Sequence, residues 1–164
     1  MIKIIVPHTY PNARYLNRID FPRRLGIHLW ILVEDYLFQF TLRGRTYTIL
    51  IPKGFIWDGA SIPRVAWSLI GATNGGPMLL PSLLHDVLYR SSGLAKFHGQ
   101  EGLPMITCID NDGENLFFSR SLSDTVFLDI LLWTEEFKKV QCRLCWRAVH
   151  HFGKKHFGGP CPSM

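Results

Sequence analysis

A histidine and an aspartate are adjacent in PSLLHDVLYRS, residues 81–91, a segment whose other side chains are mostly apolar. The spacing of its leucines predicts a helix of about three turns. On that helix His85 lies at the edge of the apolar face, and Asp86 faces the side of Leu83 and Tyr89. A histidine whose ring is oriented by a carboxylate is a common general base of hydrolytic enzymes. The pair therefore predicts acid–base chemistry, provided that a second acid lies opposite His85.

Asp124 is the acid best placed to be that partner. In SLSDTVFLDIL, residues 121–131, it aligns with the apolar stripe of a second predicted helix. A carboxylate in that stripe is costly to bury unless it is paired, and His85 has the donor that it needs. The pattern also allows another interpretation, in which Asp124 is only the acid that helix N-termini favour and His85 is a core histidine with satisfied hydrogen bonds.

The helices that carry these residues follow a region of predicted strands. Two alternating segments, YLFQFTL and TYTILIP, flank a turn at residues 43–45 and predict a β-hairpin, with another strand in HLWILV before them. Ser121 followed by Asp124 approximates a capping box, so the second helix is expected to begin there and to run toward Lys139. A further helix, or the continuation of this one, is expected to carry CRLCWRAVHHFG and to stop at Gly153.

These patterns predict an α+β fold, in which a small antiparallel sheet of hairpins is followed by two or three packed helices. Residues 1–25 are expected to form an extended arm with one short strand, residues 26–153 a single domain, and residues 154–164 a tail. Residues 93–118 contain the strand-like PMITCI, an Asn-Asp-Gly turn and NLFF. They predict a β-hairpin inserted between the two helices.

The composition excludes several classes of protein. At 164 residues, of which 47% are hydrophobic, the chain is long enough for one packed core and is not of a disordered type. It lacks the run of roughly eighteen apolar residues that a transmembrane helix needs, and its N-terminal segment lacks the apolar core of a signal peptide. Four cysteines are too few for a disulfide scaffold. Cys142 and Cys145 are expected to face the core of a helical protein rather than to bind zinc.

The net charge of +5 is concentrated near the C-terminus. No acidic residue follows Glu136, whereas six basic residues do, namely Lys138, Lys139, Arg143, Arg147, Lys154 and Lys155. A basic face can meet nucleic acid, anionic lipid or an acidic protein, but a solvated helix face explains the same charges. The segment matches no known nucleic-acid-binding module, so nucleic acid is not an expected partner.

The order of four sequence blocks resembles a known family. GFIWDGASIPRVAW, LLHDVLYRS, SLSDTVFLDIL and CWRAVHHFG resemble the phage and prophage proteins described as domain of unknown function 1353, over roughly residues 25–153. This resemblance implies a bacteriophage or prophage origin, and it carries little assigned function.

The segment HDVLY, with Gly76-Pro77 before it and an aspartate in a later helix, is also similar to the calcium-dependent phospholipase A-two enzymes. This second resemblance implies that His85 is the base that activates water to attack a lipid ester. It also implies that Tyr89 and Asp124 hold the imidazole in place.

The same resemblance implies a calcium site. Asp86 would bind Ca²⁺ together with backbone carbonyls near Asp58, Gly59 and Ala60, or alternatively those of residues 71–76. A hard cation of this kind takes carboxylate and carbonyl oxygens, and it would also stabilise the oxyanion of the reaction.

From these resemblances we expect a bacteriophage protein that hydrolyses lipid esters with the help of Ca²⁺ and helps the phage to enter or lyse its host. The alternative is a non-catalytic structural or assembly component of the virion, for instance of its tail. The expected partners are other virion proteins and a phospholipid membrane surface, and the expected location is the virion or the host cytoplasm.

Overall fold

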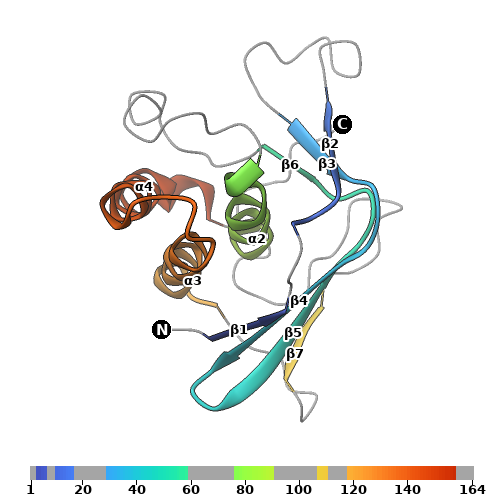
Figure 1. The fold of residues 1–164 in the computed structure, drawn as a ribbon, viewed down its shortest axis with the longest axis horizontal. Coiled ribbons are helices and arrows are strands. Elements are labelled where there is room, and N and C mark those ends of the chain that lie inside the picture. The colour runs from blue at the N-terminus through green and yellow to red at the C-terminus, as the bar shows by residue number, and fades with distance from the viewer. Residues whose placement is uncertain are drawn as a thin grey trace.

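The computed structural model describes residues 3–6, 10–16, 29–58, 76–90, 107–110 and 118–157. Within them the chain forms two antiparallel sheets and three α-helices, so the predicted α+β class is confirmed. In Figure 1 the sheets lie on one side of helix α2 (Leu79–Arg90), and helices α3 (Arg120–Trp133) and α4 (Lys139–Phe152) lie on the other. No helix in the described ranges is long and apolar enough to span a bilayer.

The larger sheet is built around the predicted hairpin. Its strand order is β1-β4-β5-β7, and the strands are β1 (Lys3–Val6), β4 (Tyr36–Leu42), β5 (Arg45–Ile51) and β7 (Thr107–Asp110). Arg43 and Gly44 form the tight turn between β4 and β5, with φ angles of 53° and 81°. Alternate residues of β4 are buried, so Phe38 and Phe40 face the core while Leu37 is exposed.

The smaller sheet contacts helix α2 through its last strand. It has the order β2-β3-β6, with β2 (Ala13–Leu16), β3 (Leu29–Leu32) and β6 (Ile56–Trp57). Trp57 is completely buried, and its indole nitrogen donates to Ser82 Oγ of α2 at 3.1 Å. This contact fixes β6 against α2 and places Asp58, the next residue, beside that helix.

Helix α2 is buried on all sides. Every residue from Leu80 to Tyr89 is buried, because the helix is covered by the sheets and by α3. Its apolar side chains join a core that includes Phe38, Trp57 and Ile130. A helix in this position must satisfy each of its polar side chains with partners from neighbouring elements, and His85 and Asp86 belong to this group.

The bounds of the last two helices differ from the prediction. The capping box at Ser121 and Asp124 is wrong: Ser119 is the N-cap, its hydroxyl accepts from Leu122 N at 3.2 Å, and α3 begins at Arg120. Asp124 therefore lies one turn inside the helix, where its side chain can be buried. The extension toward Lys139 is also wrong. Helix α3 ends at Trp133, and the chain turns through Glu135, with φ 56°, before α4 begins.

Two further segments differ from the prediction. The predicted N-terminal arm, residues 1–25, contributes a strand to each sheet: β1 pairs with β4, and β2 pairs with β3. The hairpin predicted within residues 93–118 is described only in part. Its first strand, β7, pairs with β5 of the larger sheet, and residues 111–117 lie outside the described ranges. Helix α4 ends at Phe152 with Gly153 as its C-cap, as expected.

Replacing Leu84 by alanine tests the packing of α2. Leu84 is fully buried in the core between α2 and the larger sheet, so Leu84→Ala should lower the free energy of unfolding by about 2–5 kcal/mol. Leu37 is 43% exposed on β4, and Leu37→Ala should cost less than about 1 kcal/mol. Urea denaturation of both variants measures the difference, and equal losses would contradict the packing described.

Candidate active site

The side chain of Asp124 is the centre of the first polar cluster. It is 0% exposed, and groups from three helices surround its two carboxylate oxygens. The hydroxyl of Tyr89 on α2 donates to Oδ1. The ring Nδ1 of His150 on α4 lies 2.8 Å from Oδ2, and an Arg120 nitrogen lies 3.5 Å from the same oxygen. Asp124 thus joins α2, α3 and α4.

His85 lies against this cluster. Its side chain is 5% exposed, and its Nε2 lies 3.5 Å from Asp124 Oδ1, at the outer limit of a hydrogen bond. Among the described residues, Nε2 has no hydrogen-bond partner. The ring also packs on Tyr89, with the ring centroids 3.9 Å apart, and on Phe127 at 5.1 Å. The structure therefore brings together the predicted trio of His85, Tyr89 and Asp124.

A second polar cluster is centred on Arg90 at the end of α2. Its guanidinium lies 3.0 Å from Asp86 Oδ2 and 3.7 Å from Asp58 Oδ1, and it donates to the carbonyl of Ile56. The guanidinium also lies over the ring of Phe55, 5.5 Å from its centroid. The backbone N–H of Asp58 donates to Asp86 Oδ2 at 3.3 Å. This cluster ties the end of β6 to α2.

His85 lies between the two clusters. Its Nδ1 is 3.9 Å from Asp86 Oδ1, and its Nε2 faces Asp124. Each ring nitrogen therefore has a carboxylate on its side. If the ring carries its proton on Nε2, on the side of Asp124, the lone pair of Nδ1 can accept a proton, as a general base requires.

The charges shift the pKa values of all three groups. Burial alone would lower the pKa of His85, but the carboxylates of Asp124 and Asp86 outweigh it and raise that pKa above its ordinary value. Burial alone would raise the pKa of Asp124, but contacts from His85, Tyr89 and His150 hold it below the usual range. In Asp86 the charge of Arg90 likewise overcomes the effect of burial and lowers the pKa.

Asp58 behaves differently from the other two acids. A third of its side chain is exposed, yet burial of the rest and the neighbouring charge of Asp86 raise its pKa to about 8. Burial and the charge of Asp86 thus favour the protonated form of Asp58, whereas the nearby charge of Arg90 opposes it.

The described residues include only part of the predicted calcium site. Asp86 and Asp58 are both in contact with Arg90, so a cation at Asp86 would have to compete with that guanidinium. Ca²⁺ takes six to eight oxygen ligands. No group of three or more His, Cys, Asp or Glu side chains suited to a metal occurs among the described residues. Gly59 and Ala60, the other predicted contributors, lie outside those residues, so the calcium site stays a prediction.

Three residues of the clusters were not predicted. Arg90 is four residues after Asp86, and Arg120 is four residues before Asp124, so both could have been inferred from helical spacing. His150 is 36% exposed and reaches Asp124 from a different helix, 26 residues along the chain. No spacing rule gives such a pair, because it depends on how α3 and α4 cross.

Cys142 and Cys145 face the core, as predicted. Both are free thiols and fully buried against Phe127 and Leu131 of α3. Burial raises the pKa of each thiol, that of Cys145 to about 12. Thiols in this environment are not reactive nucleophiles.

Comparison with known proteins gives one result. The profile of the family described as Protein of unknown function (DUF1353) matches residues 30–149, most of the chain. The chain belongs to this family. The DUF1353 match covers all but the first residue of β3, then β4 to β7, α2, α3 and most of α4. It thus includes His85, Asp86, Tyr89 and Asp124, and it ends one residue before His150. No curated protein and no solved structure matches the chain.

Replacing Asp124 by asparagine tests the first cluster. Asp124→Asn removes a buried charge that three helices share, so the free energy of unfolding at pH 7 should fall by about 3–5 kcal/mol. Because the pKa of Asp124 is lowered in the folded protein, its stabilisation is complete above the unfolded pKa of about 4. It is lost as the pH falls through the lower folded value.

Urea denaturation between pH 7 and pH 2 measures this effect. The difference in free energy of unfolding between the wild type and Asp124→Asn should shrink as the pH falls below about 4. Glu135→Gln, the same acid-to-amide change at an exposed position after α3, is the control and should follow the wild type. A constant difference across the whole range would contradict the role given to the Asp124 charge.

Gly153 tests the position of Tyr89. A Cβ atom at Gly153 would lie 2.7 Å from Tyr89 Oη, so Gly153→Ala must displace the hydroxyl that donates to Asp124. We expect a loss of about 1–3 kcal/mol in the free energy of unfolding, although glycine-to-alanine changes at ordinary φ angles are usually stabilising. The loss should be smaller in a Tyr89→Phe background, as a double-mutant cycle measures. Equal losses in both backgrounds would contradict the contact.

Proposed function

We propose that the protein is a phospholipase A-like lipid-ester hydrolase of a bacteriophage, with His85 as its general base. The observation that carries the proposal is the position of the His85 ring, with Nε2 3.5 Å from Asp124 Oδ1 and Tyr89 donating to the same carboxylate. A buried carboxylate that is itself held by a hydrogen bond from Tyr89 can hold a neighbouring imidazole in one orientation.

The reaction follows from this orientation. Nδ1 of His85 takes a proton from water, and the resulting hydroxide forms a bond to the ester carbonyl carbon. When the tetrahedral intermediate collapses, the bond to the alcohol oxygen breaks and His85 returns the proton to that oxygen. The products are a fatty acid and a lysophospholipid. Asp124 stays ionised throughout and stabilises the imidazolium.

Calcium enters this proposal only as a predicted cofactor. When bound at Asp86 it would stabilise the negative charge of the oxyanion. No proton transfer by His85 depends on that ion, so the metal requirement can be measured separately from the role of the base.

A second candidate function rests on the same contacts. His85 and Asp86 are each at most 5% exposed, and Arg90 neutralises Asp86, so the clusters can also serve as cross-links of a non-catalytic virion or tail component. Such a protein would be present in stoichiometric copies in purified phage particles and would release no fatty acid.

Fatty-acid release from a soluble short-chain phosphatidylcholine tests the first proposal. His85→Gln should lower the rate by about 10²–10⁴-fold, because a positioned base contributes that much, and Glu135→Gln should leave it unchanged. The base must be neutral and its pKa is raised, so the wild-type rate should climb with pH through a point above 6.5. Assays with added calcium and with a chelator define the metal requirement. No turnover under either condition, or full activity of His85→Gln, would contradict the proposal.

A further inference from the structure

Helix α4 has two opposite faces. Cys142, Cys145 and Val149 are buried against α3. On the opposite side of the helix, exposed residues follow one stripe at intervals of three or four residues. The stripe consists of Val140, Arg143, Leu144, Arg147 and His151, and we call it the outer face of α4.

The outer face lies in a strongly basic environment. Exposed cationic side chains occur on and around it, at Lys138, Lys139, Arg143, Arg147 and Lys154. The acids nearest in the sequence are Glu135 and Glu136, before the helix begins, and no acidic residue follows them. The charge on this face is therefore not balanced by acids of the same helix, and it favours an anionic partner.

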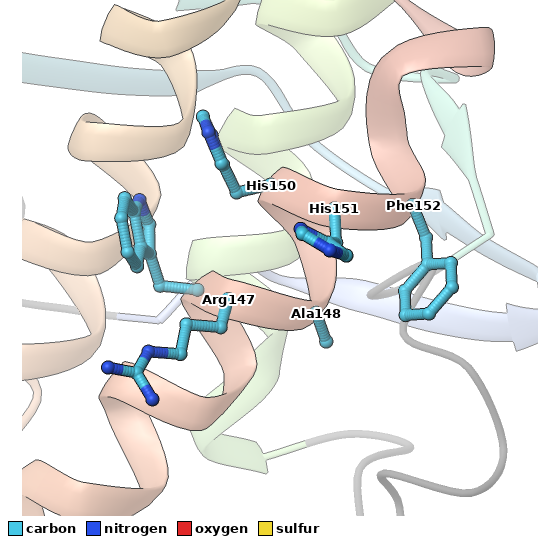
Figure 2. A pocket seen from close by; sticks show the side chains of 6 residues that line it. Arg147, Ala148, His150, His151 and Phe152 are labelled. Atoms are coloured by element: carbon cyan, nitrogen blue, oxygen red, sulfur yellow. The ribbon is translucent and has the colours of Figure 1, made fainter.

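Apolar side chains are interspersed with these cations. Val140 is 67% exposed and Leu144 lies one turn further along, between Arg143 and Arg147. Phe152 is 54% exposed at the end of the helix. It helps to line a cavity of about 440 Å³, together with Trp146, Arg147, Ala148, His150 and His151. Figure 2 shows these side chains extending from the last turns of α4.

We propose that the outer face of α4 docks on the anionic surface of a phospholipid bilayer. Arginines attract the phosphates of the headgroups, while Val140, Leu144 and Phe152 enter the boundary between headgroups and acyl chains. Nucleic acid is the other polyanion to consider. Aliphatic groups such as Val140 and Leu144 have no partner in its phosphate backbone, whereas a lipid surface accommodates both kinds of side chain.

This inference rests on the proposed function, because it places the substrate next to the Asp124 cluster. His150 lines the cavity and also contacts Asp124 at 2.8 Å, so a headgroup in the cavity would lie one side chain away from that carboxylate. The outer face would then hold the protein on the membrane whose esters it cleaves.

Co-sedimentation with vesicles tests the docking surface. The protein should bind phosphatidylglycerol vesicles more tightly than phosphatidylcholine vesicles, and binding should weaken as salt is raised. Lys139→Gln combined with Arg143→Gln should weaken binding about 30-fold, given roughly one kcal/mol for each cation at an anionic surface. Leu144→Ser should also weaken it, without altering the salt dependence. The matched control is Arg43→Gln combined with Lys53→Gln, on strand turns away from α4, which should bind as the wild type does.

Hydrolysis of a soluble short-chain phospholipid separates this inference from the proposed function. The Lys139/Arg143 double variant should lose hydrolysis of vesicles but keep hydrolysis of the soluble ester, whereas His85→Gln should lose both and still bind vesicles. Equal binding of the control and the double variant to phosphatidylglycerol would overturn the docking surface. Tighter binding to DNA or RNA than to these vesicles, lost in the same double variant, would overturn it in favour of nucleic acid.

Discussion

The buried charge of Asp124 is the constraint on which the helical half of this protein depends. A carboxylate without solvent must be surrounded by donors, and here they come from α2, from α4 and from one turn earlier on α3. Apolar packing alone would allow these three helices to slide or rotate against one another. The directional contacts at Asp124 specify one arrangement. The same carboxylate lies 3.5 Å from Nε2 of His85, so the group that joins the three helices is also part of the proposed chemistry.

The polar residues of helix α2 contact neighbouring elements on two sides of the domain. It is covered on all faces, and its polar residues divide between two neighbours: His85 and Tyr89 turn toward α3, and Asp86 turns toward Arg90 and the end of β6. The alternation of directions follows from helical geometry, because adjacent residues point about 100° apart. Adjacent residues, here a histidine and an aspartate, can thus belong to different clusters while sharing one rigid backbone.

The sequence predicted correctly the features that depend on a single helix or strand. The 3.6-residue period placed His85 and Asp124 on faces that turn inward, and alternation located β4 and β5 within one residue. Arg90 and Arg120 lie four residues from Asp86 and Asp124, so the same helical period relates each arginine to its acid.

Contacts that depend on how separate helices and strands pack could not be predicted from the sequence pattern. The approach of His150 to Asp124 depends on the crossing of α3 and α4, and the pairing of β7 depends on a strand far away in the chain. The start of α3 was misplaced because Ser119 and Ser121 are both suitable caps, and only burial of Asp124 distinguishes them.

The pairing of β7 with β5 has a consequence for the order of folding. The β4–β5 hairpin is local and can form as soon as its turn has been synthesised, but one edge of β5 has no partner until residues 107–110 leave the ribosome. During that interval an open, apolar strand edge is available to other chains. Correct assembly therefore depends on how quickly the distant strand arrives, which makes the rate of synthesis across residues 52–106 a determinant of the yield of folded protein.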